Sequence, residues 1–105
     1  MIVTFNEVYL RDLFKKGSCN DKKHRFQPQV IRGYQKGVKY MFKARSPEEL
    51  RMINSLNFEP LKGDKKGLFS IRANDKYRIE FTMEVNEEEP VLTICNIVEL
   101  SNHYK

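Results

Sequence analysis

The stretch EPLKGDKKGLFSIRANDKYRIEF, from Glu59 to Phe81, predicts a basic loop that leads into a β-hairpin. Side chains alternate between the two faces of a strand, so every second residue belongs to the same face. In this stretch the apolar residues fall on one set of alternating positions and the charged residues fall on the other. The apolar set, which we assign to the core, is Phe69, Ile71 and Ala73 in the first strand and Tyr77, Ile79, Phe81 and Met83 in the second.

The turn of this hairpin must keep both apolar sets on one face of the sheet. A two-residue turn at Asn74-Asp75 would place apolar residues opposite charged ones. A three-residue loop at residues 73–75 avoids this conflict, because Asn or Asp can adopt the left-handed backbone that such loops need. The pairs predicted from this loop are Phe69–Ile79, Ser70–Arg78 and Ile71–Tyr77.

The opposite face of the hairpin carries an excess of positive charge. Arg72, Lys76 and Arg78 fall on it, and within the strands only Glu80 compensates. A merely charged, solvent-exposed sheet face is the simplest explanation, although such faces usually mix signs. We favour a phosphate site, because a guanidinium held on a rigid sheet can bind a phosphate through two parallel hydrogen bonds.

The remaining segments predict an α+β fold. Their apolar spacing and their Pro and Gly boundaries indicate helices, and a last segment that is apolar on both faces indicates a central strand. The order gives two to three helices packed on one face of a mostly antiparallel sheet of about four strands. Gly33 and Gly37 share a helix face and permit close approach of another element. The predicted elements are a strand at residues 1–5, helices at 6–17, 28–44 and 46–54, and a final strand at 91–100.

Length and composition predict one domain, residues 1–105, with a single small core. No apolar run approaches the roughly 20 residues that span a membrane, and the polar start of the chain does not fit a signal peptide. Cys19 and Cys95 form no CxxC pair, so we expect reduced thiols. These features predict a cytoplasmic protein.

The net charge of +5 is concentrated in the first half of the chain. Between Arg11 and Arg45 eleven basic residues are opposed only by Asp12 and Asp21. Lysines on solvated helix faces explain part of this excess. The asymmetry also indicates a polyanionic partner such as RNA, or an acidic protein partner.

The end of the chain adds groups that could complete an RNA-cleaving site. Attack of a ribose 2′-OH on the adjacent phosphodiester needs a base, cations to stabilise the charged phosphorane, and an acid for the leaving oxygen. Glu59, the hairpin cations, and His103 with Tyr104 are a sufficient set. This chemistry requires no metal, and the sequence has no ligand cluster with metal spacing. Spacing alone does not show that Glu59 and His103 meet.

Three blocks of the sequence resemble the toxins of the RelE/ParE superfamily, and most closely the HigB-like plasmid maintenance killer proteins. The pattern of that family is LKGD-x-x-G-x-[WF]-S-[IV]-R-[IV]-N-x-x-[YW]-R-I-x-F, with an aromatic residue and a His near the end. The N-terminal strand and two long helices also suit the family, so the resemblance covers nearly the whole chain and implies a RelE-like fold. The matching blocks are EPLKG (59–63), GLFSIR (67–72) and YRIEF (77–81), followed by the pair HY (103–104).

The resemblance implies a toxin that enters the ribosomal A site, cuts mRNA there without a metal, and is neutralised by a cognate HigA-like antitoxin. By position, Glu59 matches the proposed general base of YoeB-like members, and Arg78 matches the arginine proposed to hold the scissile phosphate. His103 matches the general acid, and Tyr104 a group that orients or stacks on a nucleotide. The residues expected to contact RNA are Lys62, Lys65, Lys66, Arg72 and Lys76.

Several alternatives stay open from the sequence. HigB-type members often have His in place of Glu59 and RelE relies on lysines, so Lys62 is the rival base. The ending SNHYK differs from the common DYH, so Tyr104 could replace His103 as the functional group. A ParE-like protein would instead poison DNA gyrase, and a non-catalytic domain would bind nucleic acid or a partner protein.

Overall fold

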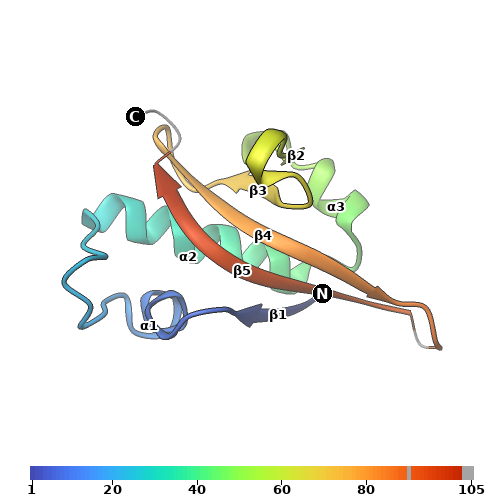
Figure 1. The fold of residues 1–105 in the computed structure, drawn as a ribbon, viewed down its shortest axis with the longest axis horizontal. Helices are drawn as coiled ribbons and strands as arrows, with labels where there is room; N and C mark the ends of the chain where they lie inside the picture. Colours follow the sequence, from blue (N-terminus) through green and yellow to red (C-terminus); the bar gives the residue numbers. More distant parts are fainter. Residues whose placement is uncertain (90, 103–105) are drawn as a thin grey trace.

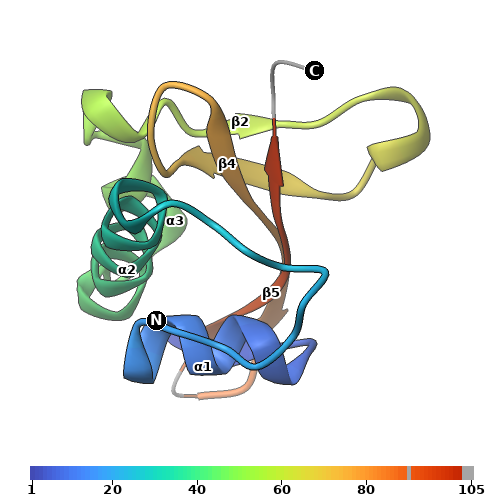
Figure 2. The same cartoon turned by 90° about the vertical axis from the view of Figure 1, so that its left-hand side faces the viewer.

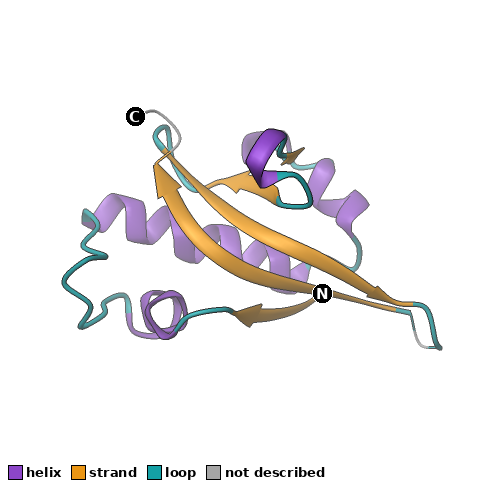
Figure 3. Ribbon diagram, viewed as in Figure 1, coloured by secondary structure: helices purple, strands orange, loops and turns teal. Residues whose placement is uncertain are grey.

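A computed structural model describes residues 1–89 and 91–102 and places the three α-helices before most of the strands (Figure 1, Figure 3). Two short 3-10 turns, η1 (Asn54–Leu56) and η2 (Gly63–Lys65), flank the shortest strand. The elements are β1 (Ile2–Phe5), α1 (Val8–Lys16), α2 (Pro28–Lys43), α3 (Pro47–Arg51), β2 (Glu59–Pro60), β3 (Phe69–Arg72), β4 (Tyr77–Asn86) and β5 (Leu92–Asn102).

The strands form one sheet in the order β1-β5-β4-β3-β2. β1 runs parallel to β5, and the other three pairings are antiparallel. The α+β class, the mostly antiparallel sheet and the central position of the last strand are therefore confirmed. The sheet has five strands rather than four, because the two residues of β2 pair with β3 inside a segment that was predicted to be a loop.

The helices α1 and α2 cover one face of this sheet, as Figure 2 shows. α2 presents a buried stripe at helical spacing, which includes Tyr34, Val38 and Met41. The hydroxyl of Tyr34 donates a hydrogen bond of 2.8 Å to the carbonyl of Leu10 in α1, so the two helices are joined inside the core. The sheet side of the core is formed by the buried residues Ile71, Ile79, Phe81, Cys95 and Ile97.

The hairpin of β3 and β4 has the predicted faces but not the predicted register. Ser70 pairs with Glu80 instead of Arg78, and Arg72 pairs with Arg78. The reason lies in Asn74, whose side-chain oxygen accepts hydrogen bonds from the backbone N–H groups of residues 76 and 77 at 2.9 and 2.8 Å. This turn starts one residue later than predicted. The pairing therefore moves by two residues, which leaves every side chain on its predicted face.

The face of the sheet opposite the helices is the outer face. The loop with η2, which follows the edge strand β2, extends on the side away from α2 (Figure 2). Ser70, Arg78 and Glu80 are 0%, 5% and 5% exposed, so this part of the outer face is not open to solvent as the charge pattern had suggested. Within the described residues, no helix is long and apolar enough to cross a membrane.

Candidate active site

Strand pairing gathers the polar side chains of the outer face into two adjacent rows. Glu59 of β2 pairs with Ser70 of β3, and Ser70 pairs with Glu80 of β4. In the next row Arg78 pairs with Ser101 near the end of β5. Directly paired residues share a face of the sheet. The pairing therefore brings together Glu59 and Ser101, which are 42 positions apart in the sequence.

Arg78 is the buried cation at the centre of this arrangement. Its Nε donates to the hydroxyl of Ser70 at 2.9 Å. Its Nη2 donates to the carbonyl oxygens of Asn57 at 2.5 Å and Ser70 at 3.2 Å. These acceptors lie on two different segments and fix the plane of the guanidinium. The sequence predicted the cation but not its burial.

Glu59 lies beside this guanidinium. One carboxylate oxygen is 3.6 Å from Nη2 of Arg78, and the Glu59 side chain is 40% exposed while that of Arg78 is 6% exposed. The half-exposed carboxylate is within reach of a bound molecule, and the fixed cation beside it can attract an anion. The structure thus brings together the two residues that the resemblance assigns as base and phosphate-binding group.

Glu80 forms a second buried polar centre on the same face, and the sequence indicated it only as charge compensation. Its Oε2 accepts hydrogen bonds from Nζ of Lys65 and from the hydroxyl of Ser101, both at 2.7 Å. The hydrogen bond to Glu80 raises the pKa of the Lys65 ammonium above its ordinary value. Lys65 was predicted to contact RNA, whereas in the structure its ammonium is hydrogen-bonded to the carboxylate of Glu80 in β4.

The other predicted cations differ in their surroundings. Lys62 and Lys66, at the two ends of the η2 loop, are exposed, and so is Lys76 in the β3–β4 turn. Arg72 is half-exposed and bound within its own turn, through a hydrogen bond of 3.2 Å to the carbonyl of Asn74 and an ion pair with the carboxylate of Asp75. The remaining predicted site residues, His103 and Tyr104, lie outside the described residues.

Known protein families and sequences show what this chain is similar to. The model of RelE-like toxins of the type II toxin-antitoxin system HigB matches residues 3–93. Toxin HigB-1 of Vibrio cholerae serotype O1 is 31% identical over 83 residues, which cover 77% of this chain and 82% of the relative. The chain belongs to the HigB-like toxin family.

Solved structures agree with this HigB-like toxin at the level of fold. A YoeB/ParE toxin from Agrobacterium tumefaciens superposes with a TM-score of 0.56 at 14% identity, covering 99% of this chain and 100% of that one. A point mutant of YafQ from E. coli superposes with a TM-score of 0.52 at 12% identity, covering 95% of this chain and 90% of that one. The family match ends at residue 93, so it includes Glu59 and Arg78 but not the end of β5.

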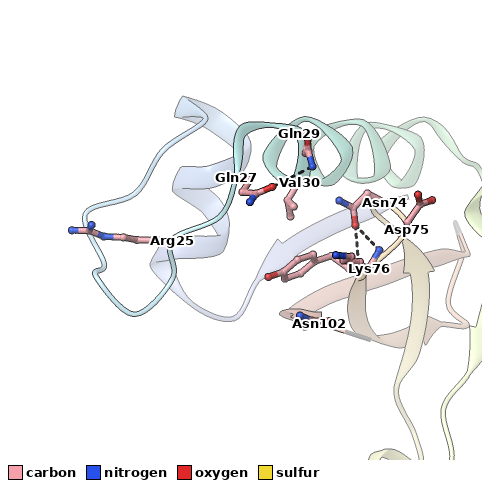
Figure 4. A pocket seen from close by; sticks show the side chains of 9 residues that line it. Arg25, Gln27, Gln29, Val30, Asn74, Asp75, Lys76 and Asn102 are labelled. Atoms are coloured by element: carbon pink, nitrogen blue, oxygen red, sulfur yellow. Dashed lines mark hydrogen bonds between the residues drawn. The ribbon is translucent and has the colours of Figure 1, made fainter. Parts of the chain in front are cut away.

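A pocket of about 630 Å³ opens where the β3–β4 turn meets the start of α2, and no sequence pattern predicted it. In Figure 4, Gln27, Gln29 and Val30 line one side, Asn74 and Lys76 line the other, and Arg25 points away. The pocket of this HigB-like toxin has the size of ligand sites in other proteins. Its lining is polar and carries charges of both signs, with Asp75 beside Lys76. Tyr77 and Asn102, which are cross-strand partners, complete its lining and immediately follow the Arg78–Ser101 pair along the sheet.

The described residues also contain two free cysteines and no group of three or more His, Cys, Asp or Glu side chains that could hold a metal ion. Cys19 is half-buried in the loop after α1, and Cys95 is buried in β5. Burial raises the pKa of the Cys95 thiol to about 11, which makes it a poor nucleophile at neutral pH. Neither thiol lies among the residues of the outer-face site.

Proposed function

We propose that this HigB-like toxin is a ribosome-dependent mRNA endoribonuclease that inhibits translation. The observation that carries the proposal is the Glu59–Arg78 pair, a half-exposed carboxylate 3.6 Å from a buried guanidinium on a rigid sheet. In the proposed reaction the ribose 2′-OH attacks the adjacent phosphodiester, and the leaving 5′-oxygen takes up a proton. A fixed cation lowers the barrier most where negative charge develops on the phosphate.

Each residue of the proposal has a separate role. Arg78 binds the scissile phosphate, and Glu59 takes the proton of the 2′-OH, with Lys62 as the alternative base. His103 donates the proton to the leaving oxygen, and Tyr104 orients or stacks on a nucleotide. The proposed reaction uses no metal. The exposed cations Lys62, Lys66, Arg72 and Lys76 attract the RNA backbone.

As the toxin of a toxin-antitoxin system, the chain has an antitoxin as its partner. We propose that this antitoxin is HigA-like and that the toxin acts on mRNA at the ribosomal A site in the cytoplasm. The basic segment between Arg11 and Arg45, which includes the exposed face of α2, suits contact with ribosomal RNA or with an acidic region of the antitoxin.

The test is mRNA cleavage in a purified translation system, with and without ribosomes and with and without a chelator. The native chain is compared with Glu59→Gln and His103→Ala, and Glu84→Gln serves as the matched control because Glu84 is an exposed carboxylate of β4 remote from Glu59. We expect ribosome-dependent cuts that end in a 2′,3′-cyclic phosphate and resist the chelator. Both site variants should lose at least about a hundred-fold in rate, and the control should keep the native rate.

Two results would overturn the proposal. One is a folded native protein that arrests growth but leaves mRNA intact on ribosomes, which would favour inhibition of DNA gyrase. The other is cleavage that persists at the native rate in Glu59→Gln and in Lys62→Gln, because no proposed base would then be needed. A non-catalytic domain would bind RNA without producing new 3′ ends.

A further inference from the structure

Glu80 joins three segments of the outer face through one carboxylate oxygen. The residue belongs to β4, it is 5% exposed, and its Oε2 accepts from Lys65 in η2 and from Ser101 near the end of β5. A buried carboxylate is costly unless it is paired and hydrogen-bonded, and these two donors satisfy it. Lys65 itself remains 47% exposed, so its ammonium bridges the buried carboxylate and solvent.

The three joined segments are those that carry the proposed site residues. The η2 loop begins directly after Lys62 and follows Glu59 by four residues, β4 carries Arg78 two residues before Glu80, and Ser101 precedes His103 by two residues. The loop has glycines with positive φ at both ends, Gly63 at 66° and Gly67 at 97°, and neither has another atom within 4 Å of a Cβ position. Such glycines add backbone freedom at both ends of the loop. Backbone hydrogen bonds close the loop on itself, for example from the N–H of Leu61 to the carbonyl of Leu68 at 2.9 Å, and the Lys65–Glu80 contact ties it to β4.

We propose that Glu80 is a positioning residue of the active site, which holds the η2 loop and the end of β5 in register with Arg78. This inference rests on the proposed ribonuclease function and assigns Lys65 to holding the loop rather than to binding RNA. The HigB-like pattern quoted above specifies no residue at positions 65 or 80, so the pair is not part of that pattern. Displacement of reacting groups by about 1 Å can reduce a rate about a hundred-fold.

A positioning role of Glu80 and a purely electrostatic effect of its negative charge on Arg78 predict different kinetic changes. Glu80 and Arg78 are two residues apart on one face of β4, roughly 6.6 Å along the strand. Removal of the carboxylate charge should therefore strengthen phosphate binding at Arg78 and lower KM, with little change in kcat. Loss of positioning should lower kcat instead. Glu80→Gln removes the charge but keeps an acceptor oxygen, whereas Glu80→Leu removes both.

The experiment measures single-turnover and steady-state mRNA cleavage on ribosomes by the native chain and these two variants. Glu84→Leu is the matched control, because Glu84 is an exposed carboxylate of the same strand. We expect kcat to fall at least about ten-fold in Glu80→Leu and less than about three-fold in Glu80→Gln and in the control. In Glu80→Leu, additional loss of Lys65 (Lys65→Gln) should reduce kcat no further, because both changes break the same contact.

Hydrogen exchange of the RNA-free protein tests the same contact without relying on activity. Amides of residues 62–66 should exchange at least about three-fold faster in Glu80→Leu, while those of the β3–β4 ladder keep their native rates. Unchanged loop exchange, a native kcat in Glu80→Leu, or an equal loss in Glu84→Leu would each overturn the inference. If the native chain does not cleave RNA, the proposed function fails by itself, and the exchange rates still decide whether Glu80 holds the loop.

Discussion

Replacement of Arg78 by lysine separates a phosphate-binding arginine from a purely structural one. The side chain donates to the hydroxyl and carbonyl of Ser70 and to the carbonyl of Asn57, besides its pair with Glu59. A hydrogen bond to a charged group is worth about 1.5–3 kcal/mol, and such values do not add fully within one network. We therefore expect Arg78→Ala to cost about 3–5 kcal/mol of stability, because it leaves buried acceptors without donors.

Lysine can replace only part of this network. Its ammonium retains the charge and one or two of the contacts, so Arg78→Lys should cost about 1–2 kcal/mol. Small domains are stable by about 5–15 kcal/mol, so this variant should remain folded. Its cleavage rate should nevertheless fall at least about a hundred-fold, because lysine is a point charge that cannot bind a phosphate through two parallel donors.

The measurements are urea unfolding followed by circular dichroism and single-turnover cleavage on ribosomes, corrected for the folded fraction. Arg51→Lys is the control, because Arg51 is exposed and lies over the ring of Phe58, where lysine can take its place. If Arg78→Lys cleaves within about three-fold of the native rate, two parallel donors are not needed and the phosphate role is refuted. If Arg78→Ala is as stable as the native chain, the buried network contributes nothing.

Further predictions concern the packing of α2, the reactivity of the two thiols and the titration of a buried tyrosine. Gly33→Ala should lose about 1–3 kcal/mol in urea unfolding, because its Cβ would lie 2.0 Å from a backbone carbonyl oxygen of the β3–β4 turn. Gly37→Ala should be nearly neutral, since the one contact of its Cβ under 3.0 Å is with the end of the Ile79 side chain, at 2.6 Å, and alanine gains up to about 1 kcal/mol in helix propensity. Alkylation at pH 8 should modify Cys19 first and reach Cys95 only after unfolding, because burial raises the pKa of Cys95 to about 11. Burial also raises the pKa of Tyr34 above that of an unfolded tyrosine near 10, so the stabilising effect of its protonated form is complete below pH 10 and declines as the pH rises further. Unfolding at pH 9 and pH 11 should show this decline in the native chain and a smaller one in Tyr34→Phe.

The faces of the hairpin could be predicted from the sequence because alternation along a strand does not depend on how the turn is closed. The register could not, because it depends on which backbone groups the side chain of Asn74 binds. The same limit applies to β2, whose two residues are too few to show alternation. Gly33 and Gly37 were correctly predicted to permit close approach, since α2 lies against the hairpin backbone at Gly33 and mainly against hairpin side chains at Gly37.

The chemistry of RNA cleavage grouped Glu59 with the hairpin cations and the family pattern singled out Arg78 among them, but strand pairing supplies the physical reason that the two residues meet. Periodicity could not predict the burial of Arg78, because one of the two carbonyls that accept from it belongs to an irregular segment at Asn57. Nor could it predict the pocket at the sheet end, where Gln27 and Lys76 come together from distant segments. Contacts between irregular segments leave no periodic signal in the sequence.

The burial of Arg78 bears directly on how the proposed reaction would be controlled. A mobile surface lysine would lose side-chain entropy when it bound a phosphate, whereas the guanidinium of Arg78 is already fixed by Ser70 and Asn57. In the RNA-free protein the carboxylate of Glu59 lies 3.6 Å from this guanidinium. A phosphate that binds Arg78 would compete with this carboxylate for the same cation. Binding of RNA would then weaken the ion pair between Arg78 and Glu59 at the moment when a base is needed. Without substrate, the same ion pair would neutralise the buried guanidinium. With substrate bound, its carboxylate would be released to act as the base.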